Sequence, residues 1–327
     1  MRRRHLLAAT AASLAGPTIV LPGAARAQAW PSKPVRLLIP FAPGGTSDIL
    51  ARLLQPHLQQ AFGQSVVVEN RTGANGTIAV DLVAKAPPDG HTVVLTDVGS
   101  LAITPSVMKV PFDIAKDLSF VTVLIYSPHM LAMAPGHKVS SVAELIAEAK
   151  ANPDKLNVAT AGLGSAPHLA GARFAHALGL KWTTIPMKGG AEAIQQVSGG
   201  HADLLFNGMV ATLPHVKNNR LKGIAVSSPK RHELAPELPT IIESAGIKDF
   251  VTGSWQGIIA TAGTPKPALE RFHAEVARIS AMPEVAAKYR EFCAGQLLYK
   301  PAESDTWIKD EIVRWAAVVK DTGIKLE

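Results

Sequence analysis

Two short glycine-rich segments contain the residue types that bind an anion. The first, Pro-Gly-Gly-Thr-Ser-Asp at 43–48, follows the apolar run 35–39 and precedes a helical pattern. Glycine lets a backbone turn sharply and approach a ligand. The first N–H groups of a helix lack internal partners and carry partial positive charge. This segment therefore predicts an anion site with hydroxyl donors from Thr46 and Ser47, although the same residues also fit an ordinary N-cap, with Asp48 as a cap.

A second segment repeats this pattern. Val-Ala-Thr-Ala-Gly-Leu-Gly-Ser-Ala-Pro-His at 158–168 also follows an apolar strand-like run, and it places Pro167 near the start of a helix, where proline is favoured. If the two segments open two lobes, opposing helix N-termini face one cleft and can hold a carboxylate, or the two ends of a diacid. Neither segment is a nucleotide loop, because no P-loop lysine and no G-x-G-x-x-G pattern is present.

Four further positions are weaker candidates. His168 either donates to a ligand or bonds within its own loop, and Lys188 either adds positive charge at the cleft or is simply exposed to solvent. Asn207 either offers its amide to a ligand or helps make a turn. The segment Val98-Gly99-Ser100 follows a predicted strand and is expected to form part of the floor of the cleft.

Nothing in the sequence indicates catalysis or a bound metal. There is no G-x-S-x-G elbow and no H-E-x-x-H pair. Cys293 is the single cysteine, which excludes a cysteine-based zinc site and an internal disulfide, and we expect it to be buried in a helical stretch. The eleven histidines are scattered. We therefore expect no catalytic residue, no metal and no cofactor.

The elements that must position these residues alternate between strands and helices, which is typical of parallel α/β units. Pro56 predicts that the helix 48–62 is kinked or ends near Gln55. Two long β-prone runs, 120–134 (interrupted at Ser127-Pro128) and 249–262, flank a self-contained block. Strands are expected at 35–39, 66–69, 92–96, 156–161, 182–186, 203–206 and 221–226, and the other helices at 77–86, 141–150, 166–178 and 191–198 and through most of the tail from 266.

This order predicts two α/β lobes joined by two crossing strands, with a ligand cleft between them. The first lobe is expected to contain residues 28–127 plus 254–327, and the second 128–253. In open α/β sheets, ligands bind outside the carboxyl ends of the strands. With two lobes, those ends can face each other across the cleft.

The first 27 residues have the pattern of a cleaved export signal. Three arginines at 2–4 precede an apolar stretch, and Ala25-Arg26-Ala27 supplies a cleavage site before Gln28. The arginines fit either a Sec or a twin-arginine signal. Removing this segment takes away four arginines and no acidic residue, so the formal charge falls from +7 to +3. No basic stripe remains, so we expect no nucleic-acid partner, and we expect a periplasmic protein without a membrane anchor.

Longer matches, in order along the whole mature chain, give a family resemblance. They include WPSKPVRLLIPFAPGGTSDILARLL, GQSVVVENRTGANGTIA, PDGHTVVL, NVATAGLGSAPHLAG, IPMKGG, LPHVKNNRLKGIAVSSPKR, PTIIESAG, SWQGIIATAGTPK and AAVVKDTGIK. In these stretches the chain resembles the Bug-type receptors of tripartite tricarboxylate transporters. The resemblance implies a periplasmic-binding-protein fold that captures a small carboxylate for membrane subunits. It also implies that the two glycine-rich loops hold the carboxylate, at Ala42 to Ser47 and at Thr160 to Ser165.

The chain departs from the pattern of these receptors in places. Phe41 stands where the family often has Tyr, Met187 where Tyr is common, Asn207 where Asp is frequent, and Val98-Gly99-Ser100 where Gly-Thr-His is frequent. The loss of an acid argues against an amino-acid ligand, whose ammonium group needs a carboxylate partner. The departures thus favour an acid with an uncharged distal part, within the ligand classes that the resemblance implies, which are di- or tricarboxylates, acidic amino acids and aromatic acids.

The sequence therefore predicts a monomeric solute receptor that works by lobe closure, without chemistry. The alternatives are an exported enzyme acting on a small organic acid, or a receptor that presents its ligand to a membrane sensor. The candidate binding residues are Phe41, Ala42, Gly44, Gly45, Thr46, Ser47, Asp48, Gly99, Ser100, Thr160, Ala161, Gly162, Gly164, Ser165, His168, Lys188 and Asn207.

Overall fold

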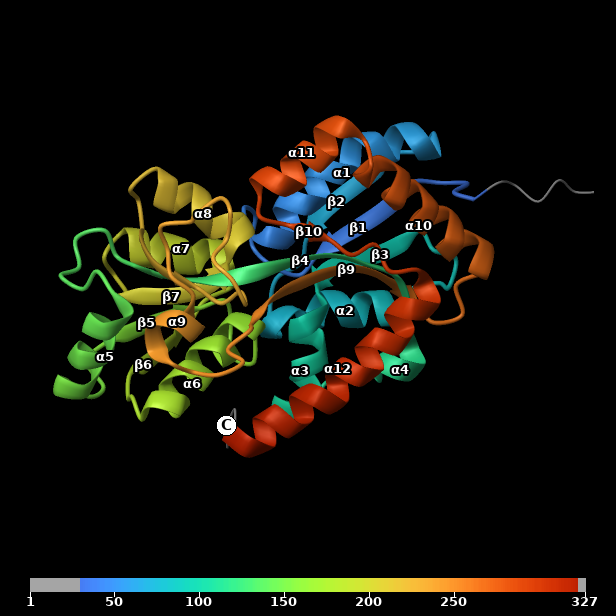
Figure 1. Cartoon of the computed structure of the whole chain (residues 1–327). Coiled ribbons are helices and arrows are strands. Elements are labelled where there is room, and N and C mark those ends of the chain that lie inside the picture. Colours follow the sequence, from blue (N-terminus) through green and yellow to red (C-terminus); the bar gives the residue numbers. More distant parts are fainter. Residues whose placement is uncertain (1–29, 323–327) are drawn as a thin grey trace, which may run out of the picture.

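The computed structural model describes residues 30–322, so the predicted export signal lies outside the described residues. Its strands form one continuous sheet in the order β2-β1-β3-β9-β4-β7-β5-β6, and β8 and β10 also pair with β4. Helices cover both faces of this sheet, and the sheet divides into two lobes (Figure 1). No helix within residues 30–322 is long and apolar enough to cross a membrane.

The first lobe combines the start and the end of the described chain. Its strands are β1 (Val35–Ile39), β2 (Val66–Asn70), β3 (Thr92–Asp97), β9 (Gly253–Thr261), β10 (Gly295–Gln296) and the first part of β4 (Leu118–Met133). Its helices are η1 (Ala74–Gly76), α2 (Thr77–Ala84), α3 (Val98–Val107), α4 (Ile114–Asp117) and α12 (Pro301–Thr322), with α1 (Thr46–Phe62), α10 (Lys266–Ser280) and α11 (Pro283–Glu291) on the opposite face of the sheet (Figure 1).

The sequence of α1 explains its length and its orientation. Leu50, Leu54, Leu58 and Phe62 recur every four residues, and all four are buried in the core between α1, α10 and the sheet. Gly63 ends the helix in the left-handed conformation at φ 62°, with its N–H donating to Gln59 O.

The second lobe is formed by the middle of the chain. Its strands are β5 (Asn157–Thr160), β6 (Thr183–Pro186), β7 (Leu204–Gly208), β8 (Lys222–Val226) and the end of β4. Its helices are α5 (Val142–Ala151), α6 (Ala166–Leu178) and α9 (Ile241–Ala245) around one core, and α7 (Gly190–Ser198) and α8 (Met209–Lys217) around the other.

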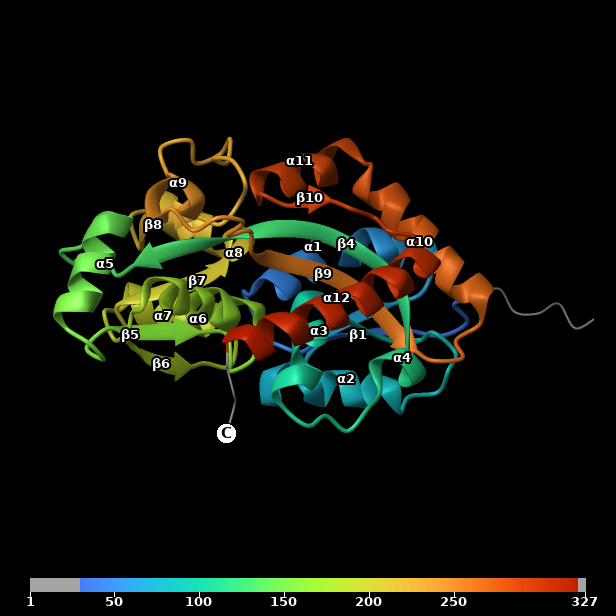
Figure 2. The ribbon, with the colours of Figure 1, turned by 60° about the horizontal axis from the view of Figure 1, so that its bottom comes forward.

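The strands β4 and β9 join the two lobes (Figure 2). From Leu118 to Pro128, β4 pairs antiparallel with β9, and from His129 to Met133 it pairs with β7 and β8 instead. His129 is fully buried at this change of partner, and its Nδ1 lies 3.0 Å from Thr252 Oγ1. The predicted pair of crossing strands is therefore confirmed.

Several local predictions were wrong. Helix α1 does not end near Gln55 but continues past Pro56, because this residue is exposed and leaves the buried leucine face intact. β4 runs unbroken through Pro128, where the strand changes partners. Helix α3 was not predicted; it begins directly after residue 97 and is capped by the Asp97 side chain. Cys293 is buried as expected, but it follows α11 in a turn at φ 56°.

Candidate functional site

A small pocket with a cavity volume of about 40 Å³ lies where the two lobes meet. Both lobes contribute to its wall, and among its lining residues Asp97 alone has an ionisable side chain. The lining residues are Phe41, Gly45, Thr46, Ser47, Asp97, Ser100, Ala161, Ser165, Pro167, Gly190, Asn207, Gly208, Ser254 and Gln256.

The N-terminus of α1 opens onto this pocket without a side-chain cap. Gly45 occupies the N-cap position, and no side chain accepts a hydrogen bond from the first turn. The hydroxyl of Thr46 has no hydrogen-bonding partner among residues 30–322, whereas the Ser47 hydroxyl donates to Gln256 Oε1 at 2.6 Å. The first-turn amides and the Thr46 hydroxyl are therefore available to a ligand.

Two helices of the second lobe present the same kind of N-terminus. α7 begins after Gly189 and α8 after Gly208, and neither helix has a side-chain cap. Gly190 packs against the Asn207 amide so closely that an added Cβ would lie 2.4 Å from Asn207 Oδ1, and a Cβ on Gly208 would lie 3.1 Å from Thr46 Oγ1. Three uncapped helix N-termini thus converge on one pocket, where their partial positive charges favour an anion.

The N-terminus of α6 differs from the one that the second glycine segment predicts. Ser165 caps α6 by accepting from His168 N–H at 3.2 Å, and its own hydroxyl donates to Gly162 O at 2.7 Å. Ala166 N–H donates across the lobes to Ser100 Oγ at 3.0 Å, and Pro167 has no N–H. In this structure the N–H groups of the first turn of α6 are therefore already bonded, and the uncapped partners of α1 are α7 and α8.

The structure brings eight of the predicted site residues to the pocket wall. They are Phe41, Gly45, Thr46, Ser47, Ser100, Ala161, Ser165 and Asn207. The predicted residues that do not line it are Ala42, Gly44, Asp48, Gly99, Thr160, Gly162, Gly164, His168 and Lys188.

The buried Asp48 shapes the first loop rather than lining the pocket. Its carboxylate accepts from Gly44 N–H at 2.9 Å, from Arg52 Nε at 2.9 Å and from Asn70 Nδ2 at 3.1 Å. Burial alone would raise the pKa of Asp48, but the bonds to Arg52, Gly44 and Asn70 outweigh it and lower the pKa below its usual value. The charge of Asp48 is thus satisfied within the loop. Gly44 sits beside it at φ 83°, a conformation that favours glycine.

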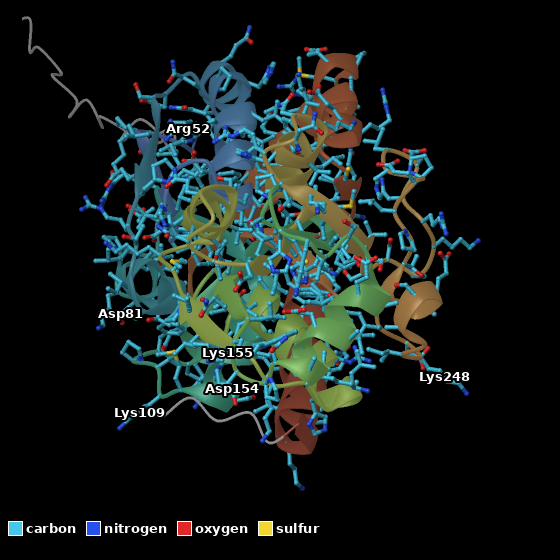
Figure 3. The ribbon with its side chains drawn as sticks, turned by 90° about the vertical axis from the view of Figure 1, so that its left-hand side faces the viewer. Arg52, Asp81, Lys109, Asp154, Lys155 and Lys248 are labelled. Carbon is cyan, nitrogen blue, oxygen red and sulfur yellow. The ribbon has the colours of Figure 1, made fainter. Side chains whose placement is uncertain are left out.

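The two basic candidates, His168 and Lys188, do not supply charge to the pocket wall. Burial lowers the pKa of His168 to about 4, and its Nδ1 accepts from Gly164 N–H at 3.1 Å, so it closes its own loop. Lys188 is exposed. Other lysines are also spread over the surface, with Lys109 and Lys248 on opposite edges of the view in Figure 3. No basic side chain lines the pocket, so the groups there that carry partial positive charge are the backbone amides of the helix N-termini.

Sequence reasoning missed a polar floor made by Asp97, Ser254 and Gln256. Ser254 and Gln256 lie two residues apart on β9 and therefore point to the same side. Gln256 Nε2 donates to Ser254 Oγ, and Ser254 Oγ donates to Asp97 Oδ2, both at 2.6 Å. Burial raises the pKa of Asp97 to about 6, although Ser254 and the amides of Ser100, Gly99 and Trp255 all oppose the increase. The only signal for this floor was the alternation of polar residues within an apolar strand.

Asp97 also affects the argument about amino-acid ligands. An acid does line the pocket, so the premise that the site lacks one was wrong. However, the carboxylate of Asp97 already accepts from Gly99 N–H, Ser100 N–H and Ser254 Oγ. It acts as the N-cap of α3, and because its oxygens already accept these bonds, they are not free to pair with the ammonium group of a ligand.

The chemistry of the site is anion binding. No cluster of histidine, cysteine, aspartate or glutamate suited to a metal ion occurs in the part of the chain that the structure describes. Two α/β lobes, two crossing strands and a pocket between the lobes define a periplasmic-binding-protein fold.

Comparison with known proteins identifies the family. The model for the tripartite tricarboxylate transporter family receptor matches residues 50–324. Protein BugT of Bordetella pertussis is 33% identical over 329 residues, covering 100% of both chains. The structure of periplasmic binding protein BugD is 32% identical with a TM-score of 0.87, covering 91% of this chain and 100% of that one. That of R. palustris Rpa4515 with adipate is 33% identical with a TM-score of 0.86, covering 90% and 99%.

The chain belongs to the tripartite tricarboxylate transporter receptor family, as the sequence resemblance predicted. It is a solute-binding receptor of the periplasmic-binding-protein type, and members of this family bind their solutes without converting them.

Proposed function

We propose that this receptor binds a small dicarboxylate and that α1, α7 and α8 hold one of its carboxylates. The convergence of three helix N-termini, each with a glycine at the N-cap position and no side-chain cap, carries this proposal. Each leaves first-turn amides unbonded by side chains, and together with the Thr46 hydroxyl they provide more donors than the two oxygens of one carboxylate require. A neutral or cationic ligand would leave these donors without acceptors, which is costly in a closed site.

The second carboxylate is proposed to lie near Ser100 and Ser165, where α3 and α6 meet. Ser100 Oγ accepts from Ala166 N–H, and its own proton has no acceptor among the described residues, so it remains a donor. The middle of the ligand then crosses the floor of Ser254 and Gln256. The relative with adipate binds a six-carbon dicarboxylate, which supports this ligand class.

The middle of the ligand would lie against the uncharged side chains of Ser254 and Gln256, and the oxygens of Asp97 are already bonded. Both features argue against an amino acid as the ligand. An ammonium group would find no free carboxylate here, and a buried unpaired charge is costly. A tricarboxylate or an aromatic acid with a second anionic group remains compatible with the same donors.

The transport role is proposed from the family. The loaded receptor delivers its ligand to the membrane subunits of a tripartite tricarboxylate transporter, as a monomer and without nucleic acid. Residues 1–27 are proposed to direct export to the periplasm through the Sec or the twin-arginine route. The proposed lobe boundaries are 28–127 plus 254–327 for the first lobe and 128–253 for the second.

Calorimetry on protein freed of co-purified ligand tests this function. The panel contains succinate, adipate, citrate, benzoate, aspartate and glutamate. We expect saturable heat from at least one of succinate, adipate and citrate, and none from aspartate or glutamate. Tight binding of either amino acid, or no binding of any di- or tricarboxylate, would contradict the proposal.

A further inference from the structure

A continuous hydrogen-bonded chain connects the α1 end of the pocket to Asp97. The Ser47 hydroxyl donates to Gln256 Oε1 at 2.6 Å, and Gln256 Nε2 donates to Ser254 Oγ at 2.6 Å. Ser254 Oγ donates to Asp97 Oδ2 at 2.6 Å. All four side chains line the pocket and are at most 6% exposed, so water cannot easily replace these bonds.

The direction of this chain is set by its last member. An ionised carboxylate only accepts, so Ser254 must donate to it, and the Ser254 oxygen then accepts from the Gln256 amide nitrogen. The Gln256 oxygen therefore faces Ser47 and accepts a hydrogen bond from the Ser47 hydroxyl. In this state Ser47 offers a ligand only lone pairs, which repel a carboxylate oxygen.

Protonation of Asp97 reverses every bond. The new O–H of Asp97 donates to Ser254 Oγ, and the Ser254 proton turns towards Gln256. The Gln256 carboxamide rotates by half a turn, so its oxygen accepts from Ser254 and its nitrogen donates to Ser47. The proton of Ser47 is then released towards the ligand. One proton is taken from solvent by Asp97, and no other bond to hydrogen is broken.

We propose that Asp97, acting through Ser254 and Gln256, is a specificity-determining residue that makes the receptor take up a proton together with its carboxylate ligand. The coupling has two sources. Protonation removes a negative charge from the pocket wall, and it converts Ser47 from an acceptor into a donor. The coupling of proton uptake to ligand binding rests on the proposed carboxylate ligand, whereas the hydrogen-bonded chain from Ser47 to Asp97 does not.

The surroundings of Asp97 allow it to titrate. Burial raises its pKa to about 6, and its main opposing contacts are neutral donors. The charged groups on the elements around it are engaged elsewhere: Asp48 with Arg52 on α1, Asp81 with Lys85 on α2, and Arg314 with Glu311 on α12 beside the Trp255 ring. On α6, burial lowers the pKa of His168 to about 4, so it stays neutral above that pH. None of these groups forms a hydrogen bond or an ion pair with Asp97.

Calorimetry with adipate in two buffers of different ionisation enthalpy counts the protons taken up. With the pKa of Asp97 near 6 in the free protein and raised by the ligand, uptake at pH 7 is about 0.9 proton per adipate, and the Kd rises about tenfold between pH 7 and pH 8. Adipate binding with no proton uptake at pH 7 would overturn the coupling while leaving the proposed function intact.

Variants distinguish the effect of the hydrogen-bonded chain from the effect of the Asp97 charge alone. Asp97→Asn mimics the protonated acid, so its Kd should be independent of pH between 7 and 8. Ser254→Ala keeps the Asp97 carboxyl group but interrupts the hydrogen-bonded chain between Asp97 and Gln256, so fewer protons should be taken up than in the wild type. Undiminished uptake in Ser254→Ala would overturn the relay. Asp305→Asn removes another partly buried acid, one that accepts from Phe120 N–H outside the pocket, and should leave uptake unchanged.

A measurement without ligand covers the case in which no dicarboxylate binds. In protein labelled with ¹³C at aspartate carboxyl carbons, the signal of Asp97, assigned by its loss in Asp97→Asn, should titrate between pH 5 and pH 7. The midpoint should rise in Ser254→Ala, because the ionised form loses a hydrogen bond. A carboxyl that does not titrate in this range, or a midpoint unaffected by Ser254→Ala, would overturn the relay even if the proposed function has failed on its own test.

Discussion

Placing a carboxylate on Gly45 tests whether the α1 amides are a binding device. Gly45 is the uncapped N-cap of α1, and its φ of −79° and ψ of 169° suit any residue. A Cβ there would meet its nearest neighbour, Ala42 O, at 3.5 Å, an ordinary contact. In Gly45→Asp the new side chain can therefore cap α1 and occupy the amides that the proposed ligand needs.

The two expected effects have opposite signs. Aspartate at an N-cap is better than glycine by a few tenths of a kcal/mol, and a negative charge at the helix terminus adds about 0.3–1 kcal/mol, so the free energy of unfolding should rise by about 0.5–1 kcal/mol. A ligand carboxylate would lose two charge-assisted bonds at about 1.5 kcal/mol each, which is about a 150-fold weaker Kd.

Calorimetry with adipate and thermal unfolding of the free protein measure the two effects on the same samples. Gly45→Ala, which adds the Cβ without a cap, is the matched control, and Gly45→Asn supplies a neutral cap of the same size. Binding should be weakest in the aspartate variant. If Gly45→Asp binds adipate as tightly as Gly45→Ala does, the α1 amides do not hold the ligand and the reasoning fails.

Three further changes have defined outcomes. Thr46→Val removes a hydroxyl that has no hydrogen-bonding partner among the described residues and should weaken adipate binding about tenfold, while Thr46→Ser should not; equal losses in both would contradict this role. Lys188→Ala should change the Kd by less than about twofold, since an exposed charge outside the pocket is screened. Burial lowers the pKa of His129 to about 3. Below about pH 6.5 this histidine is therefore protonated in the unfolded chain but stays neutral in the folded protein. In unfolding by denaturant, His129 should contribute about 2 kcal/mol of the stability that is lost between pH 6.5 and pH 5, and His129→Gln should reduce the total loss by about that amount.

Much of the fold followed from local patterns in the sequence. The alternation of apolar strands and amphipathic helices gave the two-lobed architecture, and α6 was predicted with the bounds that the structure shows, Ala166–Leu178. The errors arose where tertiary contacts override local signals. Pro56 does not end α1, because the buried leucine face holds the helix together, and Pro128 does not end β4, because the strand exchanges partners there.

The first glycine segment reaches the pocket wall, and so do Ala161 and Ser165 of the second, but the first-turn amides of α6 are bonded within the protein. Gly162 and Gly164 suggested a second anion loop, yet Ser165 and Ser100 satisfy the α6 amides. Whether an N-terminus is free depends on which side chain reaches it from another element, and spacing along the chain does not encode that. Ser254 and Gln256 were missed for a related reason, since their role depends on Asp97 from a neighbouring strand.

A crystal structure with adipate tests the central claim most directly. One carboxylate should lie within hydrogen-bonding distance of the first-turn amides of α1 and of at least one of α7 and α8, with Thr46 as an additional donor. A carboxylate bound instead by Lys188 or by other surface side chains, with the three helix N-termini left to water, would contradict it.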